Sequence, residues 1–93
     1  MIKMILYKNV HGNSGVKSYY LGDDYILIEF NDAYYLYSFD SAGYEAVVEM
    51  KRKAKKGEGL SGFISKHIRE RYEKMYKDLK EMESYLKRRL VKS

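Results

Sequence analysis

Residues 25–39 read Tyr-Ile-Leu-Ile-Glu-Phe-Asn-Asp-Ala-Tyr-Tyr-Leu-Tyr-Ser-Phe, and this stretch decides the fold. It contains two runs rich in aromatic and β-branched residues, which are typical of strands. Asn31 and Asp32 separate the runs, and both residue types tolerate positive φ, so they suit a two-residue hairpin turn. The strand pairs expected from this turn are Phe30 with Ala33, Ile28 with Tyr35, and Ile26 with Tyr37.

This hairpin gives the sheet two unequal faces, because successive side chains of a strand point to opposite sides. The first face holds Ile26, Ile28, Phe30, Tyr35, Tyr37 and Phe39. The second face holds Tyr25, Leu27, Glu29, Tyr34, Leu36 and Ser38. The first face is more apolar, so we expect helices to cover it, and we expect the half-polar second face to be partly open.

The rest of the chain predicts a single α+β domain over residues 1–93. Apolar residues change from a period of two to a period of 3.6 near residue 40, so strands precede helices. Ser41 and Ser61 are suitable helix N-caps, and the two glycines at Gly57 and Gly59 stop the first helix. The expected elements are an antiparallel sheet with strands at about 2–8, 16–21, 25–30 and 33–39, then helices at about 41–56 and 62–91.

Composition excludes several classes of protein. A hydrophobic content of 45% is ordinary for a globular chain. The chain has no cysteine, which excludes a disulfide framework and a thiolate metal site. No apolar run approaches the length of a membrane-spanning helix, and the N-terminal segment is too short for a signal peptide. We therefore expect a cytoplasmic protein that does not act at a membrane.

Positive charge is concentrated in the second half of the chain. Residues 1–40 carry three lysines and five acidic residues, for a charge of −2, whereas residues 41–93 carry fifteen Lys and Arg and eight acidic residues, for +7. Such a basic half suits a polyanionic partner. The alternative is an ordinary solvated helix surface. The candidate nucleic-acid-binding residues are Lys51, Arg52, Lys53, Lys55, Lys56, Lys66, Arg69 and Arg71, with Tyr34 as a stacking surface.

Catalysis finds little support in the sequence. The two histidines, His11 and His67, have no second ligand or base at a useful spacing. The glycine-rich segment 57–62 lacks the lysine that follows a phosphate-binding loop. We therefore predict no catalytic residue, no metal site, no cofactor and no enzymatic activity.

A Tyr-x-Tyr strand followed by two helices, the second carrying Gly62-Phe63 and Ile68-Arg69-Glu70-Arg71-Tyr72, resembles the KTSC domain. That small domain occurs at the C-terminus of some lysyl-tRNA synthetases and also alone. The resemblance covers residues 14–72 and leaves 73–93 as a helical extension. It implies an α+β fold and RNA binding. The motif residues are Tyr35, Tyr37, Gly62, Phe63, His67, Ile68 and Tyr72.

The C-terminal segment predicts a protein interface as an alternative function. Six apolar residues follow one another at spacings of 4, 3, 4, 3 and 4, as in the heptad seam of a coiled coil. They are Ile68, Tyr72, Met75, Leu79, Met82 and Leu86. On a single helix over 62–91, the part beyond the domain core would expose Met75, Leu79, Met82, Leu86 and Leu90. We expect two copies to bury this stripe in a homodimer. The same helix could instead fold back along its own sheet or bind a different protein.

Overall fold

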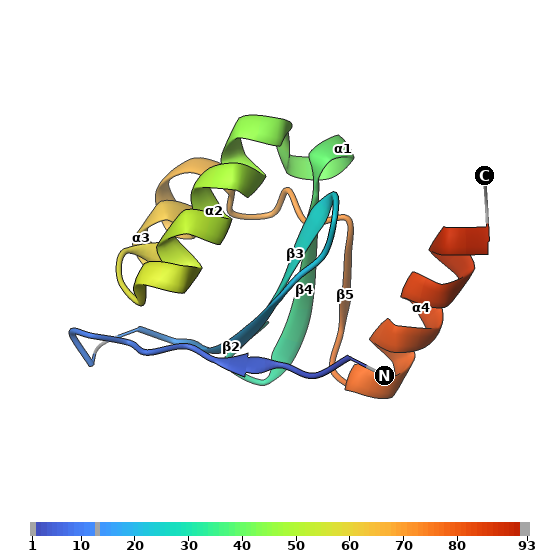
Figure 1. Ribbon diagram of the computed structural model, residues 1–93, viewed down its shortest axis with the longest axis horizontal. Helices are drawn as coiled ribbons and strands as arrows, with labels where there is room; N and C mark the ends of the chain where they lie inside the picture. Colours follow the sequence, from blue (N-terminus) through green and yellow to red (C-terminus); the bar gives the residue numbers. More distant parts are fainter. Residues whose placement is uncertain (1, 13, 92–93) are drawn as a thin grey trace.

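The computed structural model describes residues 2–12 and 14–91, without the side chains of residues 90 and 91. Its strands are β1 (Ile5–Leu6), β2 (Val16–Leu21), β3 (Tyr25–Phe30), β4 (Ala33–Ser38) and β5 (Lys74–Tyr76). Its helices are α1 (Phe39–Ala42), α2 (Tyr44–Lys56), α3 (Leu60–Phe63), the π-helix η1 (Ile64–Ile68) and α4 (Leu79–Val91). The predicted α+β class is confirmed. The helices α1 to α3 lie on one side of the sheet and α4 lies on the other (Figure 1).

The sheet is antiparallel throughout and keeps the strands in chain order, β1-β2-β3-β4-β5. The central hairpin has the predicted register, with Phe30 opposite Ala33 and Ile28 opposite Tyr35. Asn31 takes a positive φ of 57°, as the tight turn requires. The fifth strand, β5, was not predicted. It pairs with β4, so β4 is a central strand rather than an edge strand.

The first core lies between the sheet and the helices α2, α3 and η1, as the apolar face predicted. Its buried sheet residues include Ile26, Ile28 and Tyr37. The helices contribute Val47, Met50, Ala54, Leu60, Ile64 and Ile68. Burial of this many apolar side chains is the main term that holds the helices to the sheet.

The first predicted helix is broken near its start. Gly43 has a φ of 99° and separates α1 from α2, whereas the sequence predicted one helix over 41–56. The N-cap is Ser38, not Ser41. The Ser38 hydroxyl accepts a hydrogen bond from the Ser41 N–H at 3.1 Å, and the Ser41 hydroxyl accepts one from the Ser38 N–H at 3.0 Å. The helix therefore begins earlier than predicted, because this reciprocal pair satisfies two free donors at its N-terminus.

The prediction of one continuous helix over 62–91 was wrong. The helical turns end at Arg69, which has a φ of 22°, and the chain then crosses to the edge of the sheet. The Glu73 N–H donates to the Leu36 carbonyl oxygen at 2.6 Å and leads into β5. Without β5, the outer backbone groups of β4 would lack partners. Pairing of these groups with β5 is therefore more stable than continuation of the helix.

The second core lies between α4 and the opposite face of the sheet. Met82 and Leu86 of α4 are buried against Leu27 and Leu36, and Leu79 is partly buried beside them. The predicted exposed stripe therefore folds back along its own sheet, which was one of the alternatives. Met75 lies on β5 with 37% of its surface exposed, and the side chain of Leu90 lies outside the described residues.

The first strand is shorter than the predicted 2–8. Only Ile5 and Leu6 pair with β2 as a strand. Tyr7 is buried in the first core, and its hydroxyl oxygen accepts a hydrogen bond from the Leu60 N–H at 3.3 Å. The Tyr7 N–H also donates to the Lys17 carbonyl oxygen of β2 at 3.0 Å. Leu6, which is 80% exposed, lies at the outer edge of the sheet.

None of the described helices combines the length and the apolar character needed to cross a bilayer.

Candidate functional site

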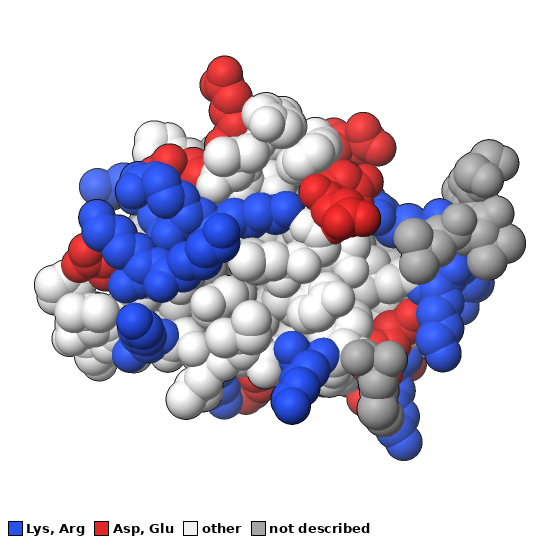
Figure 2. Space-filling view, in the orientation of Figure 1, with Lys and Arg blue, Asp and Glu red and all other residues white. Residues whose placement is uncertain are grey.

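The basic cluster of residues 51–56 lies on α2, on the side of the molecule where Lys and Arg gather in Figure 2. A shallow groove of about 550 Å³ runs along the outer surface of this helix. Its lining residues are Val48, Lys51, Arg52, Lys55 and Lys56. The groove thus combines an apolar side chain with four cations, an arrangement that suits a polyanion.

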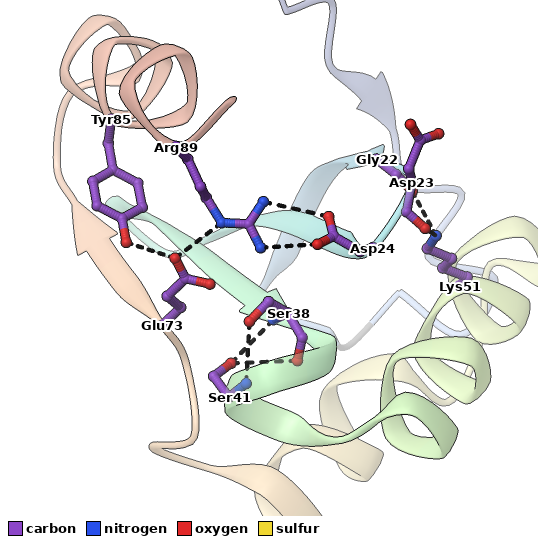
Figure 3. A network of polar contacts seen from close by, with 9 residues as sticks. All are labelled: Gly22, Asp23, Asp24, Ser38, Ser41, Lys51, Glu73, Tyr85 and Arg89. Atoms are coloured by element: carbon purple, nitrogen blue, oxygen red, sulfur yellow. Dashed lines mark hydrogen bonds and ion pairs between the residues drawn. The ribbon is translucent and has the colours of Figure 1, made fainter. Parts of the chain in front are cut away.

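Two cations of the cluster hold the fold together. The Lys51 ammonium donates to the carbonyl oxygens of Gly22 at 2.6 Å and Asp23 at 3.3 Å, which ties α2 to the β2–β3 turn (Figure 3). Lys53 lies 3.3 Å from a Glu49 carboxylate oxygen and 5.8 Å from the centre of the Phe63 ring. Both side chains are half-buried, and both ammonium groups already have partners within the molecule.

The other three cations of the cluster, Arg52, Lys55 and Lys56, are exposed. Arg52 forms a two-pronged pair with Glu49, at 2.5 Å and 3.1 Å. This hydrogen bonding lowers the pKa of Glu49 to about 2. Lys56 lies 3.6 Å from Glu58. Exposed ion pairs of this kind contribute little to stability, so an incoming phosphate can replace them.

The remaining predicted binding residues are not part of this groove. Lys66, Arg69 and Arg71 are exposed on and after η1, but they lie outside the set that lines it. Tyr34 lies on the second sheet face, half-buried in the core that α4 covers, opposite Tyr76 of β5. Burial raises its pKa. Tyr34 is therefore covered rather than open to a stacking base.

Most residues of the KTSC-like motif meet in the first core. The Tyr72 ring contacts the rings of Tyr35 and Tyr37 edge-on, with centroid distances of 5.1 Å and 6.2 Å. Ile68 is buried beside them. Phe63 lies 4.9 Å from the ring of His67, which is exposed, and Gly62 is exposed as well. These contacts give Tyr35, Tyr37, Ile68 and Tyr72 a packing role.

The sequence did not reveal a cleft of about 740 Å³ that lies beside α4. Its centre is a cluster of Asp24, Glu73, Tyr85 and Arg89 (Figure 3). The Arg89 guanidinium donates to Glu73 at 3.0 Å and to both Asp24 oxygens at 3.3 Å. The Tyr85 hydroxyl donates to the same Glu73 oxygen at 2.5 Å. Only the fold brings these residues together.

The electrostatics of this cluster favour a structural role. Burial alone would raise the pKa of Glu73, but hydrogen bonds from Tyr85, Ser38 and Arg89 outweigh it and hold that pKa below its ordinary value. The hydrogen bond to Glu73 raises the pKa of Tyr85. Neither group changes its charge near neutral pH, so neither suits general acid–base catalysis there. The cluster instead connects α4 to β5 and to the β2–β3 turn.

Lowering the pH should weaken this connection. The pKa of Glu73 is lower in the folded protein than in the unfolded chain. Its contribution to stability is therefore complete above the unfolded pKa of about 4.3, and it is lost as the pH falls through the folded pKa. We expect Glu73→Gln to be less stable than the wild type at neutral pH, with a difference that shrinks below about pH 4. Urea unfolding across this range measures it. The exposed control Glu81→Gln should stay close to the wild type, and a pH-independent loss in Glu73→Gln would contradict the assignment.

A second feature absent from the predictions is an exposed pair of His11 Nε2 and Glu58 Oε1, 3.0 Å apart. It borders a small pocket of about 290 Å³ that Ser14 and Ser61 also line. The Ser14 hydroxyl accepts a hydrogen bond from the Val16 N–H, and among the described contacts neither serine bonds to His11. Among the described residues, neither serine is therefore bonded to this pair as an activated nucleophile would be.

Among residues 2–12 and 14–91, no group of three or more His, Cys, Asp or Glu side chains is placed to hold a metal ion. Comparisons of the chain with protein-family models, with curated proteins and with solved structures found no match.

Proposed function

We propose that this chain is a small, non-enzymatic nucleic-acid-binding module that holds RNA through the outer surface of α2. The observation that carries the proposal is the groove on α2, where Arg52, Lys55 and Lys56 are exposed around Val48. Phosphate contacts from such side chains dominate affinity for nucleic acids. The resemblance of residues 14–72 to the KTSC domain supports the same function, and we propose membership in that family.

The proposal also accounts for the contrast between the two halves of the chain. The basic half, residues 41–93, contributes α2, and its charge of +7 exceeds the net +5 of the whole chain. A positive surface of this kind attracts a polyanion over a distance of about 10 Å at moderate salt. The absence of cysteine suits a reducing compartment, and we propose the cytoplasm as the location.

Removing the three outward cations should weaken binding and flatten its salt dependence. We expect the triple variant Arg52→Gln, Lys55→Gln and Lys56→Gln to reduce the slope of log K against log salt by about 2, at about 0.7 for each phosphate contact on a single strand. Titration of a labelled single-stranded RNA at several salt concentrations measures this slope. Lys51 and Lys53 are left in place, because they bind other parts of the fold.

The matched control removes the same charge from exposed positions elsewhere: Lys17→Gln, Lys77→Gln and Lys80→Gln. This control should change the slope much less, because long-range attraction falls with distance whereas a phosphate contact is lost outright. Equal losses in the two triple variants would place the site elsewhere. If the wild type does not bind at low salt, the proposed function is wrong.

The alternative function is assembly with another protein. Its sequence-based support was the apolar stripe of the C-terminal segment, but the structure buries Met82 and Leu86 within the chain. One other observation favours it. Ile5 and Leu6 expose apolar side chains on β1, which is an edge strand and can pair with a further strand. Sedimentation equilibrium decides between a free 11.0 kDa chain and a self-associated one.

A further inference from the structure

Tyr44 stands apart from the other tyrosines of the chain. The chain has eleven tyrosines, all of them within the described residues. Ten are buried or half-buried in the two cores, whereas Tyr44 has 63% of its surface exposed. It is the first residue of α2, the helix that carries the basic groove. Single exposed apolar residues are common on proteins, so its position among its neighbours carries the argument.

The neighbours of Tyr44 hold its ring in place. The ring lies 4.9 Å from that of Phe39, at an interplanar angle of 64°, which is an edge-on contact. The Lys51 ammonium lies over the same Phe39 ring, 5.9 Å from its centre. Because the contact with Phe39 already restrains the Tyr44 ring, little side-chain entropy is lost when a ligand binds against it.

Tyr44 lies on the same surface of α2 as the groove. Residues 44, 48, 52 and 55 are separated by four, four and three positions, which places them on one side of a helix. Val48, the next residue in this series, is also exposed and lines the groove. The rise from Tyr44 to Lys55 is about 16 Å, at about 1.5 Å per residue. An aromatic ring thus stands at one end of this surface, and cations stand at the other.

We infer that Tyr44 stacks on an unpaired base of a single-stranded nucleic acid whose phosphates contact Arg52, Lys55 and Lys56. The inference rests on the proposed function and specifies its ligand as single-stranded. Aromatic side chains set beside a positively charged groove bind single strands in this way, since every base has a face that can stack. A duplex keeps its bases stacked on one another and would gain only the phosphate contacts.

The structure favours Tyr44 over the tyrosines of the sheet. Tyr20, Tyr25 and Tyr34 lie on the second sheet face in the core that α4 covers. Arg89 lies 5.4 Å from the centre of the Tyr25 ring and occupies the position that a stacking partner would need. Tyr44 is 63% exposed, and it lies on the same side of α2 as the cations rather than on the far face of the sheet.

The test compares the wild type with Tyr44→Ala and Tyr44→Phe by fluorescence anisotropy. The probes are a labelled oligouridylate, an abasic strand with the same number of phosphates, and a duplex RNA of that length. We expect Tyr44→Ala to bind the oligouridylate about fivefold to a hundredfold more weakly than the wild type, the range for losing one stacked base. Its binding to the abasic strand and its salt slope should be unchanged, and Tyr44→Phe should bind like the wild type.

The possible failures are distinguishable. If the wild type binds the oligouridylate and the abasic strand equally well with a steep salt slope, stacking is excluded while the proposed function stands. Preference for the duplex, or equal loss of both single strands in Tyr44→Ala, also overturns the stacking role. No binding of any probe at low salt removes both proposals. Circular dichroism of Tyr44→Ala confirms that the variant is folded.

Discussion

Replacing Tyr37 by alanine should lower the free energy of unfolding by about 3–5 kcal/mol, the range for truncating a buried aromatic side chain. Tyr37 lies on β4 with only 3% of its surface exposed, and its ring meets the ring of Tyr72 edge-on. Its hydroxyl donates to the Arg69 carbonyl oxygen at 3.0 Å. Burial raises the pKa of Tyr37, so the hydroxyl stays protonated and continues to donate. Chemical denaturation of the purified protein measures the loss.

Two further variants separate the parts of this effect. Tyr37→Phe keeps the ring but removes the hydrogen bond to the backbone at Arg69, and should cost about 0.5–1.5 kcal/mol. Tyr44→Ala removes a mostly exposed tyrosine together with its edge-on contact to Phe39, and should cost no more than about 1.5 kcal/mol. A Tyr37→Ala protein with wild-type stability but without RNA binding would show that the Tyr-x-Tyr motif contacts ligand rather than core.

Replacing Met82 by alanine should lower the free energy of unfolding by about 2–5 kcal/mol. Met82 is fully buried, and it packs on Leu27 and Leu36 at the centre of the smaller of the two cores. The size of the loss depends on how far the surrounding side chains can move into the cavity that the truncation leaves. The exposed residue Lys87 on the same helix provides the control, and Lys87→Ala should change stability by about 0.5 kcal/mol or less.

The same experiment tests whether α4 folds back within one chain. If Met82 is buried within the monomer, the denaturation midpoint of the wild type should not depend on protein concentration. If α4 instead joined two copies in a dimer, the denaturation midpoint would rise with protein concentration, because the dimer would dissociate as it unfolds. A concentration-dependent midpoint that Met82→Ala abolishes would place α4 in a homodimer and contradict the arrangement described above.

The charged cluster around Arg89 positions α4 on the sheet, in addition to the apolar contact of Met82. Arg89 is attached to Glu73 near β5 and to Asp24 at the β2–β3 turn, two points far apart in the sequence. Burial alone would lower the pKa of Arg89, but the bonds to Asp24 and Glu73 raise it overall, so the group remains charged. Hydrophobic contact attaches α4 to the sheet, and the paired charges fix where the end of the helix lies.

The sequence predicted the central hairpin down to its register. Alternation along 25–30 and 33–39 leaves one strongly apolar face, and a slip of one residue would turn that face to water. The turn at Asn31 and Asp32 permits only a short loop, which fixes the pairing of Ile28 with Tyr35. The basic face of α2 was equally visible, because charge clusters are read directly from the residues. The sequence did not predict that Lys51 and Lys53 of this face make contacts within the molecule.

The path of the chain after Ile68 was decided by tertiary structure alone. Spacings of three and four mark an apolar stripe, but they do not say whether it faces a second chain or the same one. Two features elsewhere in the fold determine the path. The outer backbone groups of β4 require hydrogen-bond partners, and the apolar side chains of Leu27 and Leu36 on the second sheet face require burial. Both requirements exist only after the sheet has formed. No local pattern in residues 69–91 could therefore reveal the break at Arg69, the strand β5 or the packing of α4 on the sheet.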